Sequence, residues 1–174
     1  MEAIQNLLGR RSIRSYTNEQ VPKELLEQVI ECGKYAPSAG NQQRWKFIAI
    51  QSADVLAKLS DVTGVALARP ADRVMCYGAP TLVLVTFPRD YGPATADGSC
   101  AMQTMFLAAH ALGLGSCWIS SFGDAKLTEN ADVIDYLQSI GLPKEYKTMG
   151  AVSLGYPAAQ AQAAPRAEDS VLYV

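Results

Sequence analysis

The feature that most constrains the fold is the run PTLVLVTF at residues 80–87. It carries no charge, it is rich in β-branched residues, and it is too short for a long helix. Such a run is typical of a strand that is covered on both faces. Hydrophobic residues make up 49% of the 174-residue chain and charged residues 18%, which is enough apolar material for a sizeable core. We therefore expect one globular domain with residues 80–87 at its centre.

A second segment without a polar face follows at residues 97–115, DGSCAMQTMFLAAHALGLG. Its Ala- and Met-rich composition predicts a helix that is buried on nearly all sides. Asp97 is expected to be its N-cap, and Gly113 or Gly115 its C-terminal stop.

The rest of the chain alternates between helical and strand patterns. Helices are expected at residues 2–8, 23–36, 52–62 and 127–141, the last with Thr128 as cap, and further strands at 45–51, within 116–122 as a strand and loop, and at 146–157. Residues 1–157 are thus expected to form one domain, and an Ala/Gln-rich linker begins at 158. The final run, Val171 to Val174, is strand-like and could pair with the sheet edge of a second subunit.

Charge and hydropathy exclude several classes of protein. The net charge of −2 argues against a nucleic-acid-binding protein, which normally has a broad basic face. No apolar run approaches the roughly 18 residues of a membrane span. The N-terminal residues lack the pattern of a signal peptide, so we expect a cytoplasmic protein.

The common catalytic and metal-binding motifs are also missing. Four cysteines without a CxxC pair and a single histidine, His110, do not predict a metal site, and buried free thiols are expected instead. The glycines of GLGS at 113–116 end a helix, so they are no dinucleotide fingerprint, and neither a P-loop nor a GxSxG elbow occurs. No side chain is predicted to be catalytic, so any chemistry is expected to belong to a bound cofactor.

Four segments are polar where the fold does not need them. Arg10, Arg11, Ser12 and Arg14 could form an anion site or simply a solvated helix end, and the residues favour neither. The loop APSAGNQ at 36–42 and the turn WISSFGD at 118–124 could expose backbone donors to a ligand, although each segment taken alone favours an ordinary connection. Arg166 is the fourth candidate, and a tail arginine is usually solvated.

The order of these segments resembles the nitroreductase family of flavin mononucleotide (FMN) enzymes. The resemblance rests on RRSIRSY, APSAGNQQRW, APTLVLV, DGSCAMQ, LAAHALGLGSCWI and GAVSLGYP, and it covers residues 4 to about 157. It implies an α+β fold with a mostly antiparallel central sheet flanked by helices. It also implies a homodimer with FMN at the subunit interface and with the C-terminal extension, residues 158–174, packed on the partner.

The resemblance assigns a role to each candidate segment. Arg10, Arg11 and Ser12 match the phosphate-binding residues, which Arg166 would join from the tail. Arg14 matches the cation beside the flavin pyrimidine. The turn at Ser120 and Ser121 matches the backbone that faces flavin N5. The residues matching the loop that the partner lays against the flavin are Pro37, Ser38, Ala39 and Asn41.

The function that the resemblance implies is an oxidoreductase that takes hydride from NADH or NADPH and reduces a nitroaromatic or quinone-like acceptor in a ping-pong cycle. Only residues 88–96 separate the strand at 80–87 from Asp97, so the helical insertion that covers the substrate pocket in larger members is expected to be trimmed. Two alternatives stay open: a flavin-binding or flavin-sensing protein without nicotinamide-driven turnover, and a dimeric scaffold without a cofactor.

Overall fold

The computed structural model describes residues 2–70, 75–167 and 169–174. Within them, four strands form one sheet in the order β1-β2-β4-β3, and every pairing is antiparallel. The strands are β1 (Lys46–Ile50), β2 (Thr81–Pro88), β3 (Gly115–Ile119) and β4 (Tyr146–Gly155). All eight residues of β2 are buried, as the apolar run predicts, and the expected α+β class is confirmed.

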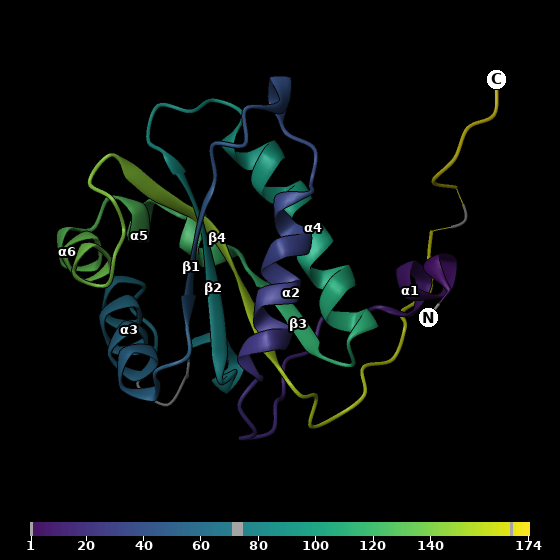
Figure 1. Ribbon diagram of the computed structural model, residues 1–174, viewed down its shortest axis with the longest axis horizontal. Helices are drawn as coiled ribbons and strands as arrows, with labels where there is room; N and C mark the ends of the chain where they lie inside the picture. Colours follow the sequence, from purple (N-terminus) through teal and green to yellow (C-terminus); the bar gives the residue numbers. More distant parts are fainter. Residues whose placement is uncertain (1, 71–74, 168) are drawn as a thin grey trace.

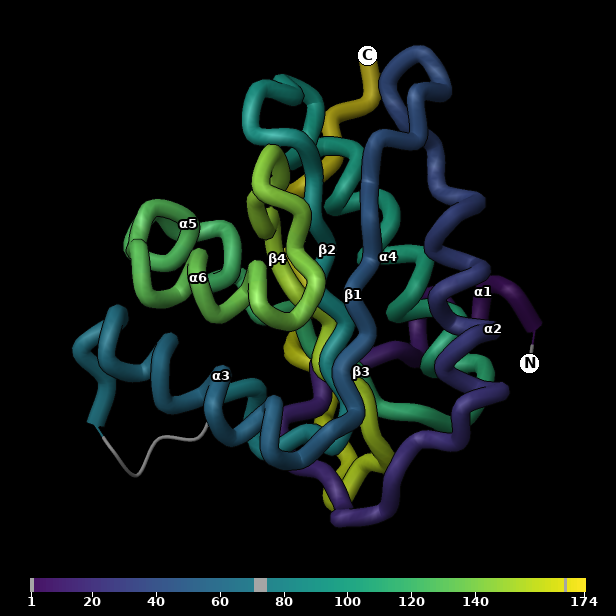
Figure 2. The backbone as a smooth tube through the Cα atoms, turned by 60° about the vertical axis from the view of Figure 1, so that its left-hand side comes forward, coloured from purple at the N-terminus to yellow at the C-terminus, as the bar shows by residue number. Residues whose placement is uncertain are grey.

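Helices cover both faces of the sheet (Figure 1). On one face lie α2 (Lys23–Lys34) and α4 (Ala94–Ala111). On the other lie α3 (Ala53–Ala66), α5 (Ala125–Thr128) and α6 (Ala131–Ser139). The turned view of Figure 2 separates the two helical layers on either side of the strands. The short helix α1 (Ala3–Gly9) packs beside α4, away from the sheet.

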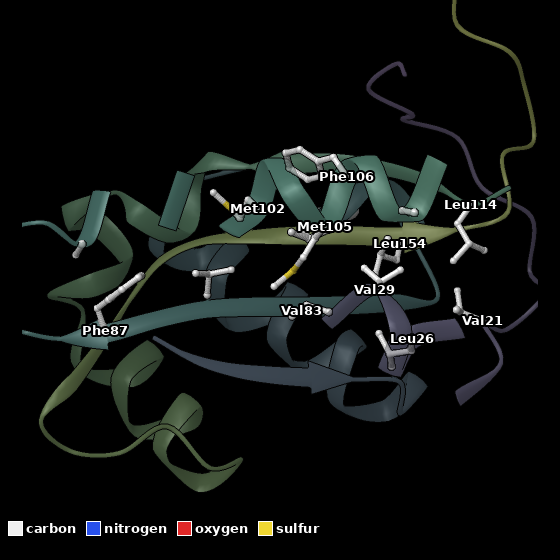
Figure 3. Packing of buried hydrophobic residues seen from close by; sticks show 14 residues of the cluster. Val21, Leu26, Val29, Val83, Phe87, Met102, Met105, Phe106, Leu114 and Leu154 are labelled. Atoms are coloured by element: carbon white, nitrogen blue, oxygen red, sulfur yellow. The ribbon is translucent and has the colours of Figure 1, made fainter. Parts of the chain in front are cut away.

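The alternation of side chains along β2 gives the sheet its two cores. Val83, Val85 and Phe87 point towards α2 and α4, where Met102 and Met105 pack against them (Figure 3). On the opposite face, residues of β2 meet α3 and α6; this second core contains Leu59, Leu82, Leu84, Phe122, Leu127, Val133 and Leu137. Both faces of β2 are therefore buried, which explains why polar and apolar residues do not alternate along this strand.

Helix α4 differs from the expectation in its start and its burial. It begins at Ala94 with Pro93 at the N-cap, so Asp97 lies one turn inside the helix and the predicted cap is wrong. The carboxylate of Asp97 is buried and accepts hydrogen bonds from other segments instead. The side of α4 facing the sheet is buried, whereas Cys100 and Gln103 on its outer side are exposed in the single chain.

One further helix differs from the predictions. The single helix expected at 127–141 is divided into α5 and α6, because Asn130 caps a new helix by accepting a hydrogen bond from Val133 N at 3.1 Å. Thr128 therefore ends α5 instead of capping the longer helix. The strand and loop expected within 116–122 are present: β3 ends at Ile119, and the chain then makes a 3₁₀ turn, η3 (Ser120–Gly123).

The cysteines and the tail also differ in part from expectation. Cys76 and Cys117 are buried as predicted, but Cys32 and Cys100 are exposed because they lie on the outer sides of α2 and α4. Residues 171–174 form no strand within the single chain; they lie extended and exposed at the end of the tail (Figure 1). None of the helices in the described ranges is long and apolar enough to cross a membrane.

Candidate functional site

Residues 12–17 run along the edge of the sheet and are held there by backbone hydrogen bonds. Ile13 N donates to Ser116 O at 2.9 Å, and Ser12 forms a parallel bridge with Ser116. Further along, Thr17 N donates to Tyr156 O at 2.9 Å. Gly115 permits this approach, because a Cβ atom there would lie 2.9 Å from the side chain of Ile13. The arginine-rich segment is thus fastened to the beginning of β3.

Tyr16, to which the sequence assigned no role, fastens the same segment to β4. Its hydroxyl donates to Ile13 O at 2.7 Å and lies 2.9 Å from Ser153 Oγ. Ser153 Oγ in turn donates to Cys117 O at 3.2 Å. Burial raises the pKa of Tyr16, so the phenol stays neutral and keeps this network intact.

The three arginines of the cluster have different surroundings. Arg10 is half-buried with its guanidinium carbon 5.7 Å from the ring centre of Phe106 on α4, and burial, followed by the charge of Arg11, lowers its pKa. Arg11 turns back to α1, where it donates to Leu8 O at 2.7 Å. Arg14 is exposed, and its guanidinium carbon lies 5.8 Å from the ring centre of Tyr77. Arg10 and Arg14 are therefore the cations available to an anionic ligand.

The serine turn η3 follows directly where β3 ends. Ser120 is exposed, whereas Ser121 Oγ is buried and is the one buried side-chain oxygen or nitrogen in the described residues without a hydrogen-bond partner. A buried hydroxyl without a partner normally costs free energy, so a ligand that hydrogen-bonds to it would relieve this cost.

The loop between α2 and β1 is built from residues in unusual backbone conformations. Gly40, Asn41 and Gln43 all have positive φ angles, between 50° and 57°. Ser38 Oγ accepts from Gln43 N at 3.1 Å, and the Asn41 side chain accepts from Gln43 Nε2 at 2.8 Å. Pro37 and Ala39 are exposed. Internal hydrogen bonds therefore hold the loop in a shape that presents its tip to the outside.

Asp97 ties this loop to α4. Its Oδ1 accepts from Ala39 N at 3.0 Å, and its Oδ2 accepts from the hydroxyl of Tyr91 at 2.6 Å. The guanidinium carbon of Arg44 lies 5.7 Å from the ring centre of Tyr91 and extends the same cluster. The sequence analysis missed this role of Asp97, which is the acid at the beginning of an otherwise apolar segment.

The single chain does not bring all predicted site residues together. The loop at 37–41 lies beside the N-terminal end of α4, and α1 with the arginine cluster lies beside its C-terminal end (Figure 1). The α4 residues that these two parts contact, Asp97 and Phe106, are nine positions apart, which is about 14 Å along the helix and two and a half turns around it, so the two contacts lie on opposite sides of α4. Arg166 is exposed in the tail, where it donates to Ala164 O at 2.8 Å, and in the described residues no contact joins it to Arg10 or Arg11.

A cavity of about 640 Å³ opens between the short connection after β2 and the serine turn. Tyr91 lies on one side and Trp118 and Ser120 on the other, with Lys147 also at its wall. This is the place where only residues 89–93 connect β2 to α4. In the described residues, no group of three or more histidine, cysteine or carboxylate side chains is placed to hold a metal ion.

The fold and the site together define a mixed α+β protein with a cationic, sheet-edge binding site. The model of the nitroreductase family matches residues 7–156. A putative NADH dehydrogenase/NAD(P)H nitroreductase of Archaeoglobus fulgidus is 32% identical over 158 residues, which are 90% of this chain and 86% of the relative. A similarly named protein of Methanothermobacter thermautotrophicus is 31% identical over 91% of this chain and 78% of its own length.

A solved structure is also similar to this chain. The crystal structure of a nitroreductase with bound FMN from Bacteroides fragilis has a TM-score of 0.92 and 32% identity, with 100% of this chain and 99% of that chain covered. The chain belongs to the nitroreductase family. The resemblance read from the sequence is confirmed, and its interpretation as a flavin oxidoreductase agrees with the names of these relatives.

The residues present fit a flavin mononucleotide. Arg10 and Ser12 offer a cation and a hydroxyl at the beginning of β3, Arg14 adds a second cation, and the unpartnered Ser121 Oγ lies just after the end of the same strand. Phosphate requires charge-assisted donors, and a flavin ring requires a cation and hydrogen-bonding groups at separate positions. Both sets lie along one edge of the sheet in the right chemical order.

Proposed function

We propose that the protein is an FMN-dependent oxidoreductase that uses NADH or NADPH as electron donor and reduces nitroaromatic, quinone or similar acceptors. The observation that carries the proposal is the pairing of Ser12 and Ile13 with Ser116, which holds the arginine segment at the edge of β3, the strand that leads to the serine turn at 120–121. Several relatives support it by name: an FMN reductase [NAD(P)H] of Bacillus subtilis is 26% identical over 95% of this chain and 70% of its own length.

Bound FMN would supply the two-electron transfer, accepting electrons from the nicotinamide and passing them to the acceptor in alternating half-reactions. The protein's task is to bind and orient. Arg10 and Ser12 anchor the phosphate, each charge-assisted hydrogen bond contributing about 1.5–3 kcal/mol. Arg14 places a positive charge beside the pyrimidine edge, where reduction adds negative charge. Ser120 and Ser121 direct the groups of their turn towards N5.

A second copy of the chain completes the site in this proposal. The loop residues Pro37, Ser38, Ala39 and Asn41 are held on the opposite side of α4 from Arg10, so the partner supplies them to each flavin. Helix α1 supports a dimer, because none of its residues is buried and the side chains of Ile4, Leu7 and Leu8 are 66%, 51% and 71% exposed. The exposed apolar residues 171–174 would pack on the partner, with Arg166 brought near the phosphate. A cytoplasmic location stays a prediction.

The open cavity beside Ser120 bears on the choice of acceptor. Its wall combines aromatic side chains, Tyr91 and Trp118, with the cation of Lys147, a lining that suits a planar acceptor. Because the connection after β2 is short, few groups are available to select one acceptor from another. We therefore expect broad acceptor use.

The experiment that tests the proposal is reconstitution followed by anaerobic reduction. The purified protein, mixed with FMN and passed over a desalting column, is expected to retain about one FMN per chain, and NADH or NADPH is expected to bleach the flavin absorbance without oxygen. A protein that retains no FMN would contradict the proposal. A protein that retains FMN but is not bleached by either nicotinamide would support the alternative, a flavin-binding protein without turnover.

A further inference from the structure

Two adjacent residues with strained backbones lie next to the arginine segment. Cys76 and Tyr77, in the 3₁₀ turn η2 (Met75–Gly78), both have a φ angle of 59°. Residues other than glycine rarely adopt this left-handed conformation, because the Cβ atom crowds the backbone. Such conformations persist where the surrounding structure holds them, and they cluster at functional sites. The backbone strain therefore directs attention to what these two side chains do.

The Tyr77 side chain is partly exposed and contacts Arg14. Its residue is 42% exposed, unusual for a large aromatic beside a core, and its ring centre lies 5.8 Å from the guanidinium carbon of Arg14. The neighbouring phenol of Tyr77 is the main cause that raises the pKa of Arg14. Tyr77 thus holds an exposed cation by its ring.

Tyr77 also reaches the serine turn. Together with Arg69 and Cys76 it lines a small cavity of about 140 Å³ that Ser120 and Ser121 also line. The ring therefore contacts the cation assigned to the flavin pyrimidine and lies beside the turn assigned to N5. Neither the sequence motifs nor the names of the relatives give this tyrosine a role.

We propose that Tyr77 is a positioning residue that fixes the guanidinium of Arg14 at the flavin pyrimidine edge and thereby raises the reduction potential of bound FMN. The inference rests on the proposed function. An unrestrained arginine on the surface samples many rotamers, whereas one held by an aromatic ring keeps its charge in one place. A charge already in place stabilises the reduced flavin without further rearrangement.

The test is a double-mutant cycle with the reduction potential as readout. The variants are Tyr77→Leu, which removes ring and hydroxyl, Tyr77→Phe, which keeps the ring, Arg14→Met, and Tyr77→Leu combined with Arg14→Met. Tyr77→Leu is expected to reduce the preference for reduced over oxidised FMN about tenfold, which lowers the two-electron potential by about 30 mV. Tyr77→Phe is expected to cause a smaller shift. In the Arg14→Met background, Tyr77→Leu should cause no further shift.

Tyr146→Leu is the matched control. Tyr146 also pairs with a cation, Lys46, whose Nζ atom lies 4.7 Å from the ring centre, and it is outside the proposed site. Its loss should leave the potential unchanged. An unchanged potential in Tyr77→Leu, or an equal shift with and without Arg14, would overturn the role of Tyr77 while leaving the proposed function intact. Failure of the parent protein to retain FMN would overturn both.

Discussion

The two ends of helix α4 differ in how far the groups around them are satisfied by contacts within one chain. At the N-terminal end, polar groups are satisfied within the chain, since Asp97 accepts hydrogen bonds from both Ala39 N and the hydroxyl of Tyr91. At the C-terminal end, Asn6 joins α1 to α4 by donating to Leu107 O at 3.0 Å and accepting from His110 Nδ1 at 2.6 Å. Yet this end leaves cations and the apolar side chains of α1 exposed.

The difference indicates which end is complete and which needs partners. The N-terminal end presents a preformed loop whose shape depends on no other molecule. The C-terminal end has unneutralised charge, which suits a phosphate, and an uncovered apolar helix, which suits a second chain. A dimer that places the complete end of one chain on the incomplete end of the other would meet both needs, and the predictions below test that arrangement.

The largest effect is expected from mixing two inactive variants. Arg10→Glu disables the arginine end, and Ala39→Arg blocks the loop end while keeping the backbone hydrogen bond to Asp97. If each site combines the two ends from different chains, mixed dimers have one intact site. Unfolding and refolding the two variants together should then restore about a quarter of the parental activity, because half the dimers are mixed. No restoration would show that each chain holds a whole site.

Removing the charge of Arg10 alone is expected to weaken FMN binding. Arg10→Ala deletes a charge-assisted contact with the phosphate, and a loss of about 1.5–3 kcal/mol corresponds to about 10- to 150-fold in affinity. Quenching of flavin fluorescence on titration measures this directly. Lys58→Ala removes a cation from the exposed side of α3 and should leave the affinity unchanged. Equal losses in both variants would mean a general charge effect.

A smaller effect is expected at the complete end. Asp97→Ala removes both acceptor oxygens of a buried carboxylate, so that Ala39 N and the Tyr91 hydroxyl lose their partner. An unsatisfied buried group costs about 1–3 kcal/mol, which should appear as a lower free energy of unfolding in urea. Asp54→Ala, on the exposed first turn of α3, is the control. We also expect faster hydrogen exchange of the Ala39 amide in Asp97→Ala alone.

The smallest effect is expected for the thiol of Cys76, the residue before Tyr77, and it concerns stability at alkaline pH. Burial raises the pKa of its thiol from 9.0 to about 12. The unfolded chain releases this proton at lower pH than the folded one, so the thiol's contribution to stability is complete below pH 9 and is lost as the pH rises towards 12. Cys76→Ala should therefore make the alkaline decline in the urea midpoint shallower, whereas the exposed Cys32→Ala should not.

Much of the fold could be predicted because local patterns and tertiary burial agree. The uniform run of β2 is buried on both faces, and the apolar stripe of α2 packs with Leu26 and Val29 in the core. The predicted helix caps were wrong where a side chain has another hydrogen-bond partner or another residue caps the helix. Asp97 has the composition of an N-cap but bonds to a loop 58 residues away, and Asn130, not Thr128, begins α6.

The sequence by itself determined the composition of the candidate site. The order of RRSIRSY, the 37–41 loop and the serine turn is enough to indicate the family, because each segment carries its own residue types and spacing. Tertiary structure decided which of these residues can act together. The hydrogen bonds at Ile13 and Tyr16 hold the segment that brings Arg14 to Tyr77, across more than 60 positions of sequence, and Tyr77 lies beside the serine turn. The loop is held on the other side of α4, at Asp97, and only the folded chain fixes that arrangement.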